Sequence, residues 1–185
     1  LADTGAIGGT GSHQFMALSE LGESNILYCD GCSYAADEEK AAAICTLTDN
    51  SEMLEIEEVH TPKQHTIEEV SNYLGVEPSK TVKCVLYKDN QNNELVAAFV
   101  RGDREVNEIK LVNALGIAEA FLGFASDDDI KSLKTYYGFI GPVGLNCKIV
   151  IDNEVSQMKN FICGANKFDY HLKNVNFGRD FDGLV

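Results

Sequence analysis

Val82-Lys-Cys-Val-Leu-Tyr87 and Leu95-Val-Ala-Ala-Phe-Val100 are two compact apolar runs, and the polar stretch Asp89-Asn-Gln-Asn-Asn93 separates them. Runs rich in β-branched and aromatic residues favour strands, and an asparagine-rich stretch between them is typical of a turn. The sequence therefore predicts an antiparallel hairpin. This hairpin decides the fold, because helix and strand signals alternate on both sides of it.

Three helices are predicted around the hairpin. Two begin with a capping box, in which a Ser or Thr side chain and an acidic residue three positions later bond each other's backbone. Glycine ends two of them, since it adopts the left-handed conformation of a helix C-terminus. The predicted helices are Thr66–Leu74 before Gly75, Val106–Leu115 before Gly116, and a helix from Ser126 to shortly before Gly138.

The C-terminal third carries further short elements. We expect a strand at Lys148–Ile151, a short helix near Val155–Asn160, and strands near Phe161 and Leu172–Phe177. Helices interspersed with hairpin-linked strands indicate an α/β (α+β) domain, with a mixed β-sheet and surrounding helices.

The N-terminal part has a different character. Gln14–Leu18 and Asn25–Cys29 are strand-like, and a helix is expected from about Asp37 to Ile44. The polar run Thr46–Glu58 lacks any apolar period and is expected to be a linker. We divide the chain into residues 1–50, 51–174 and 175–185.

Composition narrows the class of protein. The chain has 185 residues and is 44% hydrophobic, which is enough to bury one good core. No apolar run is long enough to cross a membrane, and no signal peptide is visible at the N-terminus. Six irregularly spaced cysteines are typical of reduced thiols, so we expect a cytoplasmic protein.

The charge argues against tight nucleic-acid binding by this chain alone. Fifteen basic residues are set against 29 acidic ones, giving a net charge of −14. Affinity for nucleic acids comes largely from Lys and Arg that neutralise phosphates. A domain with this net charge requires other modules of the protein to bind an RNA. The same net charge also suits a small-molecule or protein-binding domain.

Several motifs, in order along the chain, resemble one family. They are Ile7-Gly-Gly-Thr-Gly-Ser-His-Gln-Phe-Met16, Tyr28-Cys-Asp-Gly-Cys-Ser-Tyr-Ala-Ala36, Thr81-Val-Lys83, Gly138-Phe-Ile-Gly-Pro-Val-Gly-Leu145, Val150–His171 and Gly178-Arg-Asp-Phe181. Together they resemble the editing insertion of bacterial prolyl-tRNA synthetase with short flanks of its catalytic core. The resemblance also extends to free-standing aminoacyl-tRNA deacylases of the YbaK type.

The resemblance implies an organisation and an activity. Residues 51–174 would be the editing domain, 1–50 a flank of the synthetase core, and 175–185 the return segment. The domain would hydrolyse alanine mischarged on tRNA for proline, through a water attack assisted by the substrate's own ribose hydroxyl. Editing would need no cofactor. The full-length ligase would need ATP and Mg, and we expect it to be a homodimer with no membrane association.

The resemblance also assigns roles to single residues. Lys83 would anchor the terminal adenosine, and backbone N–H groups near Gly138 and Pro142 would polarise the ester carbonyl. His171 would size the aminoacyl side chain. The remaining pocket positions would be Ile67, Val70, Gly141 and Asp152.

Each of these residues also has an ordinary structural interpretation. Lys83 fits a solvent-facing position on a strand, and Gly138–Pro142 fits a turn. His171 and the two aliphatic residues fit packing positions, and Asp152 fits a helix N-cap. Functionally, the alternative is a non-catalytic insert that stabilises the synthetase or binds tRNA or a protein partner.

No metal or nucleophile set competes with the editing hypothesis. Cys29-Asp-Gly-Cys32 supplies only two of the four ligands that structural zinc requires, so we expect no zinc bound within this chain. Whether these cysteines belong to a site completed by other segments stays open. Gly8-Gly-Thr-Gly11 lacks the Lys-Ser/Thr end of a phosphate-binding P-loop.

Overall fold

The structure is a computed structural model that describes residues 2, 12–19, 21–22, 24–41, 45 and 49–185. The chain divides into two compact units. The first comprises residues 1–44 and 107–120, and the second comprises residues 45–106 and 121–185. Among the described residues, no helix is long and apolar enough to cross a membrane.

The smaller unit contains a hairpin and a helix. Strands β1 (Ile26–Tyr28) and β2 (Ala35–Asp37) pair antiparallel, and Tyr28 lies opposite Ala35. The helix α2 (Glu108–Leu115) begins at Asn107, whose side chain accepts a hydrogen bond from the Lys110 backbone, and it ends at Gly116 as the sequence predicts. Residues 14–18 form no strand, and part of the expected helix at 37–44 lies outside the described residues.

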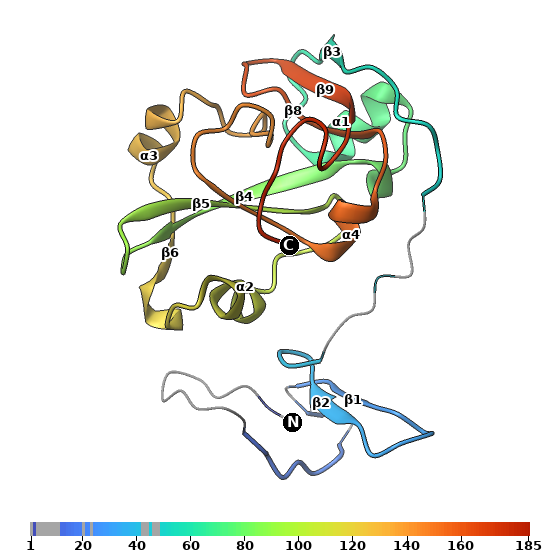
Figure 1. Cartoon of the computed structure of the whole chain (residues 1–185), viewed down its shortest axis with the longest axis vertical. Coiled ribbons are helices and arrows are strands. Elements are labelled where there is room, and N and C mark those ends of the chain that lie inside the picture. The colour runs from blue at the N-terminus through green and yellow to red at the C-terminus, as the bar shows by residue number, and fades with distance from the viewer. Residues whose placement is uncertain (1, 3–11, 20, 23, 42–44, 46–48) are drawn as a thin grey trace. The chain divides into compact units, whose positions relative to one another are not determined.

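The larger unit is built on the predicted hairpin. Strands β4 (Val82–Asp89) and β5 (Glu94–Arg101) run as a long antiparallel pair through this unit (Figure 1). Strand β6 (Leu122–Phe124) adds antiparallel to β4, and β7 (Lys148–Ile151) adds parallel to β5. The resulting order β6-β4-β5-β7 is a mixed sheet, which confirms the predicted fold class.

A second sheet of order β3-β9-β8 lies in the same unit. It consists of β3 (Glu57–His60), β9 (Tyr170–Val175) and β8 (Phe161–Gly164), and both pairings are antiparallel. A single parallel bridge between Thr81 and Ile162 joins the start of β4 to β8. The two sheets therefore meet at the N-terminal end of β4.

The apolar core of this unit is formed by side chains of both sheets and of the short helix α4 (Asn153–Gln157). Phe99, Phe161, Val155 and Val175 are at most 1% exposed. Burying such side chains stabilises the fold by about 1.5–3 kcal/mol each before the entropic costs of folding are counted.

The remaining helices follow their caps. In α1 (Ile67–Leu74) the Thr66–Glu69 capping box is formed at one end, and Gly75 is left-handed at the other. The Ser126–Asp129 box opens α3 (Asp127–Ser132) in the same way. Short 3-10 helices span Pro78–Lys80 and Glu119–Phe121.

Several predicted boundaries were wrong. The helix α3 ends at Ser132, because Lys134 adopts a left-handed backbone conformation with φ 55° and breaks the helix well before Gly138. The polar run 46–58 is not wholly a linker, since β3 begins at Glu57 and pairs with β9. The strand β6 was not predicted from the sequence.

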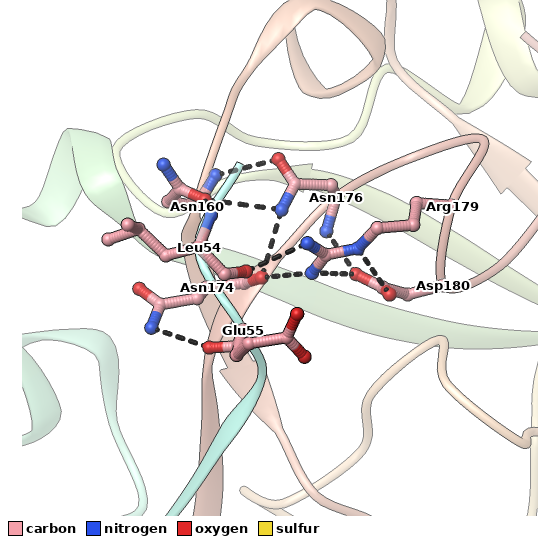
Figure 2. A network of polar contacts seen from close by, with 7 residues as sticks. All are labelled: Leu54, Glu55, Asn160, Asn174, Asn176, Arg179 and Asp180. Carbon is pink, nitrogen blue, oxygen red and sulfur yellow. Dashed lines mark hydrogen bonds and ion pairs between the residues drawn. The ribbon is translucent and has the colours of Figure 1, made fainter. Parts of the chain in front are cut away.

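A network of polar side chains connects residues 52–55 to the end of the chain. It consists of Asn160, Asn174, Asn176, Arg179 and Asp180, and we call it the asparagine–arginine network (Figure 2). Figure 2 shows the side chains of Asn160, Asn174 and Arg179 reaching the backbone at Leu54 and Glu55.

Side chains of the network replace the backbone ladder that a strand would supply. Asn160 accepts a hydrogen bond from the Leu54 N–H at 2.9 Å, and Asn174 donates to the Glu55 carbonyl at 2.9 Å. Arg179 donates to the Leu54 carbonyl at 2.8 Å. The segment before β3 is therefore fixed by residues more than 100 positions later in the chain.

Candidate functional site

A pocket opens where the two sheets meet, and the capped end of α1 forms part of its wall. Its volume is about 480 Å³, within the range of about 300–1,000 Å³ that is usual for small-molecule sites. The pocket lies wholly within the larger unit. The residues that line it are His65, Thr66, Ile67, Glu68, Val70, Thr81, Val82, Lys83, Cys84, Gly102, Tyr137, Gly138, Ile140, Ile162, Cys163, Gly164 and His171.

Lys83, the second residue of β4, lines the pocket. Its ammonium lies 2.6 Å from the Glu105 carboxylate. The lysine side chain is 22% exposed, whereas the glutamate is 86% exposed. An ion pair with so exposed a partner is weak and exchanges readily with solvent. A ligand oxygen that enters the pocket can therefore compete with Glu105 for Lys83.

His171 comes from β9 and is only 5% exposed. Its Nδ1 lies 2.7 Å from the Thr61 hydroxyl. Burial lowers the pKa of His171 to about 4, although a hydrogen bond with the Gly138 backbone opposes part of that shift. Near neutral pH the ring is consequently uncharged and fixed in place, so it acts as a wall of the pocket rather than as a mobile base.

Gly138 lines the pocket and has a φ of 79°. A Cβ atom at this position would lie 3.0 Å from the backbone of His65, closer than ordinary contacts allow. Glycine is thus required here by backbone conformation and by close approach to His65. The N–H of a residue in such a turn is available to a ligand where no strand takes it.

The loop after Gly138 is held in shape by one side chain. Asn166 donates to the carbonyls of Gly141 and Val143 at 2.9 and 3.0 Å, and it accepts from the Gly141 N–H at 3.0 Å. A side chain on Gly141 would overlap the backbone of Gly164, so the two segments are packed main chain to main chain.

The pocket gathers five of the eight residues singled out in the sequence, from four separate segments. They are Lys83, Gly138, His171, Ile67 and Val70, the last two from α1.

The other three lie elsewhere. Gly141 and Pro142 are buried in the supporting loop and do not line the pocket. Asp152 is the N-cap of α4, where its carboxylate accepts the Glu154 N–H at 2.8 Å. Pro142 and Asp152 thus do not line the pocket with Lys83 and His171, and the ordinary capping interpretation describes the position of Asp152. A contact of either residue with the substrate stays a prediction.

Sequence reasoning missed some residues of the site. Gly102, directly after β5, cannot carry a side chain because a Cβ would overlap the Thr81 hydroxyl. Asn166 was also missed, and His65 looks like an isolated histidine in the sequence although it lines the pocket. For Gly102, the available signal was its position directly after a predicted strand. No local pattern around Asn166 predicts its hydrogen bonds to residues 23 and 25 positions away.

The fold and this pocket define a class of protein, and comparison with known proteins identifies it. The sequence model of the aminoacyl-tRNA editing domain matches residues 61–181. A candidate trans-editing enzyme for prolyl-tRNA synthetase shares the fold with a TM-score of 0.56 over 65% of this chain and 76% of that one, at 18% identity.

The chain belongs to the aminoacyl-tRNA editing domain family, which confirms the resemblance seen in its motifs. It is 51% identical to the proline–tRNA ligase of a Thermoanaerobacter species over 187 residues, which cover 100% of this chain and 32% of the ligase. It is equally similar to the proline–tRNA ligase of Syntrophomonas wolfei, covering 97% of this chain and 31% of that protein. The chain thus spans about a third of the length of these relatives.

Proposed function

We propose that this chain is the editing part of a proline–tRNA ligase and hydrolyses alanine wrongly attached to tRNA for proline. The observation that carries the proposal is the convergence of Lys83, His171 and Gly138 with two aliphatic residues on one pocket. A core that served only stability would have no need to gather polar groups around a cavity.

The pocket suits discrimination by size. A synthetic site for proline cannot strongly reject a smaller amino acid on binding energy alone, so a second site that admits only the smaller product is needed. Ile67 and Val70 on α1 and the neutral ring of His171 supply rigid, uncharged walls for that site. Alanine fits between such walls more easily than proline.

In the reaction we propose, a water oxygen attacks the ester carbonyl carbon. The bond between that carbon and the ribose oxygen then breaks, and the ribose oxygen receives a proton. The products are free alanine and a tRNA with its terminal hydroxyl restored. The substrate's neighbouring ribose hydroxyl orients the water. His171 therefore does not have to transfer a proton and can serve as a wall of the pocket.

The residues of this chain would act mainly by binding and by electrostatics. Lys83 exchanges Glu105 for an oxygen of the terminal adenosine, which fixes the ester in the pocket. The backbone at Gly138, in the turn beside His65, would stabilise the negative charge that develops on the carbonyl oxygen. The hydrogen bonds between Asn166 and Gly141 keep the loop after Gly138 from shifting during that step.

The proposal extends to the longer protein. The remainder of the ligase would bind the body of the tRNA and attach proline with ATP and Mg. It would act in the cytoplasm as a homodimer. Because the net charge of this chain is −14, the tRNA-binding modules outside it would provide most of the affinity for phosphates.

A deacylation assay tests the proposal. Purified chain is incubated with alanyl-tRNA for proline and, as a control, with prolyl-tRNA. We expect slow hydrolysis of the alanyl ester and little change in the prolyl ester. A folded chain that releases no alanine at saturating substrate would refute the proposal and favour a non-catalytic insert.

A further inference from the structure

An aromatic cluster continues from the pocket to the protein surface. Within the pocket wall, the His65 ring packs against the buried Phe139 with ring centroids 5.0 Å apart. Phe139 in turn lies 5.5 Å from Phe168, and Phe168 lies 5.8 Å from Tyr136. We call His65, Tyr136 and Phe168 the aromatic rim.

The side chains of the rim are exposed. Phe168 is 55% exposed and Tyr136 is 50% exposed. Their rings are held by edge-to-face contacts with each other and with the buried Phe139, so their faces stay oriented. Such an exposed apolar surface next to a pocket marks a place where a ligand or partner binds.

Two lysines close in sequence to the rim have a strained backbone conformation. Among the described non-glycine residues with positive φ, five are Asn or Asp, which tolerate this conformation, and the others are Lys63 (62°) and Lys134 (55°). Each lies two residues from a rim residue. The Lys63 N–H is also bonded to the Asp169 carboxylate beside Phe168, at 2.9 Å. Backbone strain of this kind is concentrated at functional sites.

Both lysines are also available to a ligand. They are exposed, and neither takes part in an ion pair within the described part of the chain. Lys167, by contrast, lies 2.6 Å from the Glu58 carboxylate and 3.6 Å above the Tyr170 ring, so its charge is already engaged. The rim thus combines stacking surfaces with two unengaged cations.

We infer that the aromatic rim stacks the bases that precede the terminal adenosine of the substrate, while Lys63 and Lys134 face their phosphates. The inference rests on the proposed function and specifies how that site holds its substrate. A pocket of about 480 Å³ accommodates the aminoacyl group and one nucleoside, so the preceding nucleotides must lie outside it. The rim is continuous with the pocket because His65 belongs to both.

The charge of the chain favours stacking as the means of binding. Because the net charge is −14, binding through contacts to phosphates alone is weak. Stacking of a base on an aromatic ring needs no net positive charge. Stacking also accepts any base, which suits a single-stranded 3′ end.

Fluorescence provides a direct test, because the chain has no tryptophan. Phe168→Trp places one fluorophore in the rim, and Phe124→Trp is the matched control. Phe124 is 73% exposed, stacks on Tyr87 and lies opposite it in the sheet. It therefore lies near the end of β4, whereas Lys83 lies near the start of that strand. We expect the trinucleotide CCA to quench Phe168→Trp and to leave Phe124→Trp unchanged. Equal quenching of the two, or none, would overturn the inference.

Kinetics provide the second test. Phe168→Ala should lower kcat/KM for alanyl-tRNA by roughly tenfold to a hundredfold, the loss expected for one base–aromatic stack. The loss should be much smaller for 3′-alanyl-adenosine, which has no preceding bases, and Phe168→Tyr should retain activity on both substrates. Equal losses on both substrates would mean that Phe168 only supports the pocket, and the inference would fail.

The two tests separate this inference from the proposed function. If the wild-type chain hydrolyses neither ester but CCA still quenches Phe168→Trp, the proposed catalysis fails and the nucleotide-binding rim stands. If hydrolysis proceeds but the trinucleotide does not bind at Phe168, the catalysis stands and the rim fails. Thermal unfolding of each variant identifies any that is misfolded, and Tyr136→Ala then repeats the kinetic comparison.

Discussion

The pocket and the asparagine–arginine network are both polar regions of the larger unit, yet their polar groups are used in opposite ways. In the network, Asn176 is fully buried, and its side chain bonds Asn160 and the Asn174 carbonyl. In the pocket, the one ion pair that Lys83 makes with a described residue is to the highly exposed carboxylate of Glu105. Polar groups that satisfy one another stabilise a fold, whereas groups that face a cavity keep their capacity for a ligand.

This contrast predicts that removing Lys83 from the pocket alters activity without altering stability, and that network changes do the reverse. Lys83→Ala should give the largest effect, lowering the deacylation rate by about a hundredfold, because the terminal adenosine loses the contact that positions the ester. Its free energy of unfolding should change little, since the partner Glu105 is exposed. Rate assays and thermal unfolding measure the two quantities.

Lys88→Ala is the matched control for that experiment. Lys88 lies on the same strand and contacts the Asp129 carboxylate at 2.9 Å, away from the pocket. It should leave the deacylation rate unchanged. If both lysine variants lose activity equally, Lys83 has no special role and the contrast between the two regions breaks down.

The second prediction concerns pH and His171. The unfolded chain protonates this histidine near its ordinary pKa of 6.5, whereas the folded chain does so only near a pKa of about 4. Between these values the unfolded state binds more protons, so stability falls as pH falls from 6.5 to 4. The full contribution is about 3 kcal/mol, at 1.36 kcal/mol for each unit of pKa shift.

The measurement compares wild type with His171→Gln by denaturant unfolding from pH 7 to pH 4. Other groups titrate in both proteins, so the difference in slope isolates the histidine. We expect the wild type to lose about 3 kcal/mol more than the variant over this range. Parallel curves would show that His171 is not held neutral by burial.

The third prediction concerns the network. Asn176→Ala should lower the free energy of unfolding by about 2 kcal/mol, because it leaves partly buried partners at Asn160 and Asn174 without their hydrogen bonds. The deacylation rate per folded molecule should stay the same. Asn153→Ala, at an exposed position, is the control and should cost little. A loss of activity without a loss of stability would place Asn176 in the working site.

The smallest effect is expected at Asp152. Asp152→Ala removes the N-cap of α4 and should cost about 1 kcal/mol of stability, while Asp152→Ser should restore most of it. Neither variant should change the deacylation rate by more than its effect on folding. A selective loss of activity in both would instead make Asp152 a substrate-binding residue, although it does not line the pocket.

The sequence by itself determined the elements whose signals are local. The Thr66–Glu69 and Ser126–Asp129 boxes opened helices as predicted, and Gly75 and Gly116 ended them. These rules operate within about four residues, so no knowledge of the rest of the fold is needed. The division at residues 50 and 174 stays a prediction.

Tertiary structure decided everything that depends on residues far apart in the chain. The strand β3 forms because β9, about 110 residues later, offers it a ladder, and a polar sequence gives no local sign of this. The resemblance named Lys83, Gly138 and His171, but only the fold brings them to one pocket while leaving Asp152 as a helix cap. The position of a side chain at the meeting of two sheets is set by packing across them, and no short stretch of sequence encodes that.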